Sequence, residues 1–153
     1  MLFGRGNLVY RRKDKAMKKQ IKVYVAHSIR GKKGNDATDE DMKHNNALAI
    51  VFGQALRRKF PGVDFYIPGD HDEFILIAYR KEYLDEKQIL DVDCEIVQGC
   101  NFVLAYSPDG YLSKGMKIEI EYAGENGIPV IIVSKLDERG QNLINRQFQD
   151  LMR

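Results

Sequence analysis

Four short apolar runs, separated by segments of helical periodicity, constrain the fold of this chain more than any other feature. The runs occupy residues 21–26, 63–67, 101–105 and 130–134 and are rich in Val, Ile, Leu, Phe and Tyr, a composition that favours strands. Between them, apolar residues recur at spacings of three and four, which indicates helices that lie on a sheet. Strands that alternate with helices predict a parallel sheet buried on both faces.

Right-handed crossovers between such strands predict an α/β fold of the doubly wound, flavodoxin-like kind. We expect a small parallel sheet of four to five strands with helices on both faces. Residues 73–79 are apolar enough for a strand or a helix, and we favour a helix packed over the mouth of the site. The other helices are expected at residues 38–60, 85–99, 113–127 and 141–152. Ligands of such folds bind at the carboxyl ends of the strands.

Length and composition fit one globular domain, because the 153 residues are 44% hydrophobic and 30% charged with a formal net charge of +2. The charge is uneven, since residues 1–20 are basic. We interpret residues 1–20 as a disordered arm and residues 21–153 as a single domain. A basic arm can also contact nucleic acid, so a nucleic-acid binder is a less favoured alternative.

Neither a signal peptide nor an apolar segment of membrane-spanning length is recognisable in the chain. We therefore expect a cytoplasmic protein with no membrane partner. Cys94 and Cys100 stand six residues apart without neighbouring Cys or His side chains. This pattern indicates reduced thiols rather than a zinc site, and neither a metal nor a cofactor is predicted.

The segment at 113–129 has the features of a helix entry that accepts an anion. Ser113 can cap the helix and Gly115 lets the backbone approach a ligand, while Gly127 and Pro129 end the helix. A helix amino terminus at the carboxyl end of a strand favours negative charge. Glu119 lies one turn inside this corner, and a carboxylate beside a phosphate-binding turn suggests a nucleotide site.

A second polar turn follows the first strand, with the sequence His27, Ser28, Ile29, Arg30 and Gly31. Its backbone amides, hydroxyl and guanidinium suit a phosphate group. By itself this turn is equally well explained as an ordinary loop. The dinucleotide-binding and P-loop glycine patterns do not occur in the sequence, which disfavours those two kinds of nucleotide site.

Two acids on the helices that flank the third strand, Asp93 and Glu119, can meet at the edge of the sheet. Cleavage of a glycosidic bond uses two carboxylates in different environments. Alone, the pair would be better explained as solvated helix acids. Asp91 and Glu121 are nearby rivals, but Glu121 lies about 200° around the helix from Glu119, so only one of the two can face the edge.

Together these segments resemble the nucleoside 2-deoxyribosyltransferase superfamily, and most closely its 2'-deoxynucleoside 5'-phosphate N-hydrolase branch. The resemblance covers about residues 22–133 and rests on three motifs: Ser-Ile-Arg-Gly at 28–31, Asp93 eight residues before the third strand, and the pattern S-x-G-x-x-x-E-x-G-x-A-x-x-x-G-x-P. The positions that match this pattern are Ser113, Gly115, Glu119, Ala123, Gly127 and Pro129. The register selects Glu119 over Glu121, which stands where the family usually has Gly.

The resemblance implies an N-glycosidase without a cofactor, which hydrolyses a (deoxy)nucleoside 5'-monophosphate to a free base and (deoxy)ribose 5-phosphate. Glu119 would attack C1' of the sugar and form a glycosyl-enzyme intermediate. Asp93 would orient the sugar or Glu119 and assist proton transfer to the leaving base. The groups implied to hold the 5'-phosphate are Ser28, Arg30, Gly31 and Ser113, with the backbone amides of Ile29 and Gly115.

His27 stands where the family commonly has Gly or another small residue, and we count it among the substrate-binding candidates because it can narrow the pocket or contact the phosphate. The resemblance also implies a homodimer or a larger homo-oligomer. Two rival functions are kept. One is base exchange by a nucleoside 2-deoxyribosyltransferase, and the other is nucleotide binding by a non-catalytic sensor.

Overall fold

The computed structural model describes residues 20–153, so the disorder expected for the basic arm falls almost entirely on residues outside the described part. Four strands are present in residues 20–153, and the start and end of each lie within one residue of those of a predicted run. They are β1 (Lys22–Ala26), β2 (Asp64–Tyr66), β3 (Phe102–Tyr106) and β4 (Val130–Val133). Pattern alone therefore located every strand of the described chain.

Helices connect these strands in the expected alternation. They are α2 (Asp39–Lys59), α3 (Asp72–Arg80), α4 (Glu86–Gln98), α5 (Lys114–Glu125) and α6 (Glu138–Leu151), with short 3-10 turns η1 (Gly31–Asp36) and η2 (Pro68–His71). The apolar segment at 73–79 is helical, as predicted. Over residues 20–153, none of the helices combines the length and the hydrophobicity needed to cross a membrane.

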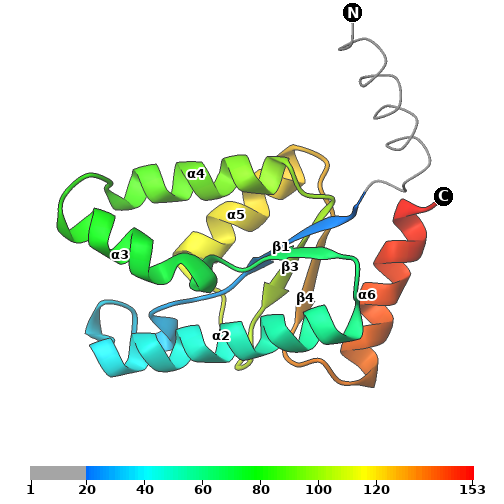
Figure 1. Ribbon diagram of the computed structural model, residues 1–153, viewed down its shortest axis with the longest axis horizontal. Helices are drawn as coiled ribbons and strands as arrows, with labels where there is room; N and C mark the ends of the chain where they lie inside the picture. The colour runs from blue at the N-terminus through cyan, green and yellow to red at the C-terminus, as the bar shows by residue number, and fades with distance from the viewer. Residues whose placement is uncertain (1–19) are drawn as a thin grey trace, which may run out of the picture.

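The sheet is entirely parallel, in the order β2-β1-β3-β4. This order confirms an α/β fold with a four-stranded, doubly wound parallel sheet of the flavodoxin-like kind. Figure 1 shows α4 and α5 side by side on one face of the sheet and α2 on the other. The predicted coverage of both faces is therefore present.

Alternation along β1 divides the core into two clusters. Val23 and Val25 point to the α2 and α6 side, where they pack with residues such as Phe52 and Ile144. Tyr24 and Ala26 point to the α4 and α5 side. Because successive residues of a strand face opposite sides of a sheet, one short strand contributes to both cores.

Side-chain caps set the helix boundaries. Thr38 and Asp41 form a reciprocal capping box at the start of α2, as the predicted start at residue 38 requires. The predicted start of the last helix at residue 141 is three residues late, since α6 begins at Glu138. Asp137 accepts a hydrogen bond from the Gly140 amide and caps this helix, a signal that the apolar periodicity does not contain.

The strand order places a topological switch point between β1 and β3. After β1 the chain crosses to β2, which lies on one side of β1, and it later returns to form β3 on the opposite side of β1. The loops that leave the carboxyl ends of β1 and β3 therefore diverge, and crevices for ligands form at this position in open α/β sheets. The polar turn at 27–31 lies in the first of these loops, and the second loop, residues 107–113, leads to the predicted helix entry at Ser113.

Gly140 occupies a closely packed position near the start of α6, shortly after β4, so that a larger residue there should destabilise the fold. A Cβ atom at this position would lie 2.4 Å from the carbonyl oxygen of Lys135, whereas a Cβ at Gly124 of α5 would meet nothing within 4 Å. We expect Gly140→Ala to lower the free energy of unfolding by about 1–3 kcal/mol through overpacking. Gly124→Ala, the matched control, is expected to raise it by about 0.5–1 kcal/mol. Urea denaturation measures both, and equal effects would contradict the steric argument.

Candidate active site

Glu119 is a carboxylate on the buried face of an otherwise amphipathic helix. The buried residues of α5 are Met116, Glu119 and Ala123, which recur at spacings of three and four. Glu119 is only 5% exposed, while Glu121 points to solvent. The register of the apolar stripe thus decides between these two acids in favour of Glu119.

Tyr24 of β1 provides the hydrogen bond that this buried carboxylate needs. Its phenol hydroxyl donates to Oε2 of Glu119, and its side chain is fully buried. None of the sequence motifs singles out Tyr24 for this role. The available signal was that a buried Tyr hydroxyl usually finds a polar partner and that Tyr24 alternates with Val23 and Val25 on β1.

Asp93 approaches the same group from α4, the helix packed beside α5 (Figure 1). Burial raises the pKa of Glu119 to about 8; the hydrogen bond from Tyr24 lowers it, and the negative charge of Asp93 raises it. Burial also raises the pKa of Asp93 to about 6. The predicted acid pair is therefore brought together, and between about pH 6 and 8 it retains one proton.

An aromatic stack extends from Tyr24 toward the rim of the sheet. The ring of Tyr66 lies 5.6 Å from that of Tyr24 with an angle of 18° between the planes. His71 in turn stacks on Tyr66 at 5.2 Å and 22°. Burial is the main cause of the raised pKa of Tyr66, and the negative charge of Asp93 raises it further. The acid pair thus borders a wall of stacked rings that ends at the exposed His71.

Gly115 serves the packing of the two helices that carry the acids. A Cβ atom at Gly115 would lie 3.4 Å from Cδ2 of Leu90 on α4, so this glycine faces the neighbouring helix. Ser113 caps α5 by accepting a hydrogen bond from the Met116 amide. The expected cap is present, and the hydroxyl hydrogen of Ser113 is left to donate to another group.

The turn after β1 is closed by hydrogen bonds within the turn and by one from α2. The Gly31 amide donates to Oγ of Ser28 over 2.8 Å, and Gly31 adopts a φ of +66°, which favours glycine. Asn45 of α2 donates to the carbonyl oxygen of Ile29. Arg30 is exposed and donates to Oδ1 of Asn35 over 3.0 Å. The turn is therefore a preformed structure whose hydroxyl and guanidinium lie near its surface.

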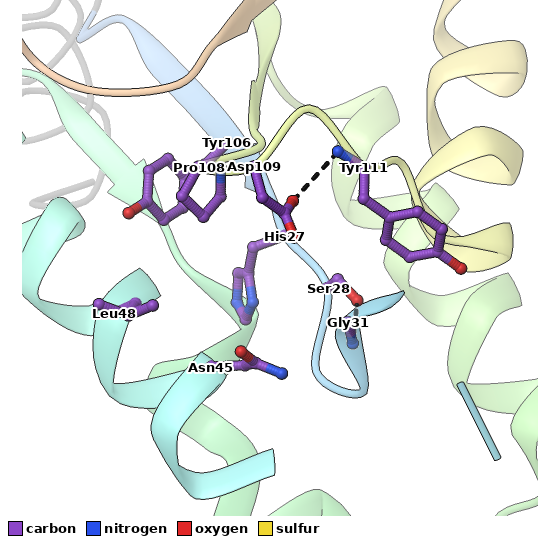
Figure 2. Close-up of a pocket in the computed structure, with 9 residues that line it drawn as sticks. All are labelled: His27, Ser28, Gly31, Asn45, Leu48, Tyr106, Pro108, Asp109 and Tyr111. Carbon is purple, nitrogen blue, oxygen red and sulfur yellow. Dashed lines mark hydrogen bonds between the residues drawn. The ribbon is translucent and has the colours of Figure 1, made fainter. Parts of the chain in front are cut away.

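A cavity of about 40 Å³ lies between this turn, α2 and the loop after β3. It sits at the topological switch point between β1 and β3, and Figure 2 shows the residues around it. The lining residues are His27, Ser28, Gly31, Asn45, Leu48, Tyr106, Pro108, Asp109 and Tyr111. Three of the predicted substrate-binding residues thus line one cavity.

The acid pair does not line this cavity. The predicted residues form two groups, because Glu119, which Tyr24 hydrogen-bonds, and Asp93 lie on the α4 and α5 side, whereas His27 lines the cavity beside α2. Within residues 20–153, no hydrogen bond joins the acid pair to the turn at 28–31. Both groups nevertheless flank the carboxyl-terminal half of β1.

The rival acids line a different surface. A groove of about 400 Å³ runs along the outer side of α4 and α5, and its lining includes Asp91, Glu95, Glu121 and Glu125. Asp91 is exposed and pairs with Lys87 over 3.1 Å. These acids are solvated helix residues, which distinguishes them from the buried pair.

Comparison with known proteins was made for the whole chain. No family model matches it, and neither a curated protein nor a solved structure matches it. The resemblance to the nucleoside 2-deoxyribosyltransferase superfamily therefore stays a prediction from the motifs. Within the described residues, no three His, Cys, Asp or Glu side chains are grouped closely enough to hold a metal ion.

The raised pKa of Glu119 predicts a stability that depends on pH. Its folded-state pKa of about 8 exceeds the ordinary value of 4.5, so the folded protein binds more protons and loses stability as pH rises between these values. Glu119→Gln removes this loss, and one pKa unit corresponds to about 1.4 kcal/mol. We expect the variant to be more stable than the wild type at pH 8 by at least about 1.4 kcal/mol.

Urea denaturation of both proteins across the range from about pH 5 to about pH 8 measures the effect. Glu121→Gln, which changes an exposed acid of the same helix, is the matched control and should follow the wild type. A constant difference between Glu119→Gln and the wild type over this range would contradict the raised pKa.

Proposed function

We propose that this protein hydrolyses the N-glycosidic bond of a nucleoside 5'-monophosphate. One observation carries the proposal: a buried carboxylate, Glu119, is hydrogen-bonded by Tyr24 and coupled electrostatically to a second carboxylate, Asp93. Two acids in unequal environments, which together retain one proton near neutral pH, are the group that glycosidic cleavage needs.

In the proposed first step, a carboxylate oxygen of Glu119 forms a bond to C1' while the bond from C1' to the base nitrogen breaks. Because Glu119 has the higher pKa, the proton of the pair rests on Glu119. Before the attack this proton passes to Asp93, which leaves Glu119 ionised, and Asp93 then donates it to the departing base. Water then attacks C1', the bond to Glu119 breaks, and one water proton returns to the pair. The products are the free base and the sugar 5-phosphate, and both carboxyl groups regain their starting state.

Tyr24 is a positioning residue in this scheme. Its hydroxyl engages one oxygen of Glu119, so the other oxygen is the one available to the sugar. The hydrogen bond also stabilises the ionised carboxylate and lowers the pKa of Glu119. A nucleophile that is otherwise protonated by burial is thereby brought nearer to its reactive form.

Phosphate anchoring is assigned to the polar turns at the same edge of the sheet. The Ser28 to Gly31 turn presents a hydroxyl and the exposed Arg30. Ser113 stands at the amino terminus of α5, where the helix dipole favours an anion. In a nucleotide bound between these groups and Glu119, the phosphate would lie at the rim and C1' deeper, beside the acid pair.

A panel of nucleoside 5'-monophosphates and the matching nucleosides tests the proposal, with free base measured by chromatography. We expect base release from at least one monophosphate, and a fall of kcat/KM by at least about a thousandfold in Glu119→Gln, because the nucleophile is lost. Glu121→Gln should retain wild-type activity.

Adding a free acceptor base separates the rivals. A new nucleotide that contains the added base would identify a transferase instead of a hydrolase. Binding of nucleotides without any base release, at equal affinity in the wild type and Glu119→Gln, would contradict catalysis and favour the sensor.

The pH profile is a further test. The pair retains one proton between the pKa values of about 6 for Asp93 and about 8 for Glu119, so kcat/KM should be bell-shaped with its maximum near pH 7. Tyr24→Phe removes a hydrogen bond that lowers the pKa of Glu119. We therefore expect its alkaline limb to move to higher pH, and an unmoved limb would contradict the role of Tyr24.

A further inference from the structure

α3 is a short helix whose apolar side chains lie largely at the surface. Within Asp72–Arg80 the one buried residue is Ala78, while Phe74 is 75% exposed and Ile77 is 47% exposed. Figure 1 shows α3 at the left-hand end of the molecule, joined to α4 by a short loop. A helix that is apolar on most of its sides is normally covered, and grouped exposed apolar side chains mark interaction sites. The outer face of α3 is therefore a candidate contact surface.

One stripe along this outer face consists of Glu73, Leu76, Ile77 and Arg80, and these four residues form the α3 stripe. They are separated by three, one and three positions, so at about 100° per residue they share one face of the helix. All four are exposed. The two apolar residues occupy the middle of the stripe, an acid stands at one end, and a base stands at the other.

The charges of α3 are arranged with opposite signs about its centre. Asp72 and Glu73 stand at the amino terminus of the helix, and Arg80 and Lys81 stand at its carboxyl terminus. Among residues 20–153, none of these four side chains takes part in an ion pair. The midpoint of the acidic and the basic positions coincides with the centre of the two apolar residues of the α3 stripe.

A second α3 in antiparallel orientation complements this pattern. A two-fold axis through the midpoint brings the acidic end of each helix beside the basic end of the other. Glu73 then lies opposite Arg80 of the partner subunit, and this pair occurs twice. At the axis, Leu76 and Ile77 pack against their own copies. A parallel pair would place like charges side by side, which is unfavourable.

We propose that the α3 stripe is a homodimer contact, in which two copies of this chain pair their α3 helices antiparallel about a two-fold axis. A second copy is the occupant because the stripe is complementary to itself both in charge and in the position of its apolar residues. The family resemblance implies a homo-oligomer but assigns no surface to it, and this contact follows from α3 alone. One helix pair makes a small interface, so the dimer should be weak, with a dissociation constant in the micromolar range.

Sedimentation velocity of the full chain at concentrations from about 1 to about 200 µM, which bracket such a dissociation constant, measures the association. Glu73→Arg and Arg80→Glu each turn both attractive pairs into repulsive ones, so each variant should dimerise at least about tenfold more weakly. An equimolar mixture of these two variants should dimerise again, because every pair in the mixed dimer joins opposite charges. Only an antiparallel contact that places position 73 against position 80 predicts this recovery.

Two further variants control the experiment, and circular dichroism checks the fold of each protein. Arg58→Glu makes the same change on an exposed residue of α2 and should dimerise as the wild type does. Ile77→Asp places two like charges together at the axis and should abolish the dimer.

Three results would overturn the inference. A wild type that stays monomeric over the whole range would leave the α3 stripe to a different partner. Equal association of the wild type and both charge variants would place the dimer contact on another surface, and a mixture that does not recover would contradict the antiparallel pairing. Base release is no part of the measurement, so the dimer contact and the proposed reaction are tested separately.

Discussion

A buried carboxylate is the constraint on which the α4 and α5 side of this molecule depends. An ionised Glu119 in an apolar environment costs several kcal/mol unless it is paired. The hydrogen bond from the Tyr24 hydroxyl offsets part of this cost, and a pKa raised to about 8 keeps the carboxyl group protonated at neutral pH. Replacing Glu119 by a hydrocarbon side chain of similar size would remove this cost, so the acid lowers the stability of the folded protein. Such strain is typical of functional sites.

β1 is the element that joins the two halves of the proposed site. Tyr24 faces α5 and reaches the acid pair, and three residues later His27 faces α2 and the switch-point cavity. Three residues span about 10 Å of strand, so one short segment carries both the phenol that binds Glu119 and the imidazole that lines the cavity. In the proposed reaction, the sugar and the phosphate of a single nucleotide occupy these two places.

Much of the fold and part of the site were predictable from local pattern. Strand positions follow from apolar runs, and the helix at 73–79 was also predicted correctly. Glu119 was preferred to Glu121 because of its motif register, and the apolar stripe of α5 makes the same choice. The start of α6 was missed because Asp137, a single capping residue, sets it. Tyr24 was missed because its partner lies 95 residues away.

The sequence by itself determined the order of strands and helices, the capped ends of α2 and α5, and which acid of α5 is buried, since each depends on residues within a few positions of one another. Tertiary structure alone decided the pKa order of Glu119 and Asp93, the stack of Tyr66 and His71, and the hydrogen bond from the Gly69 amide to His27. These properties depend on burial and on partners from other elements, and no local pattern encodes how closely two distant segments pack.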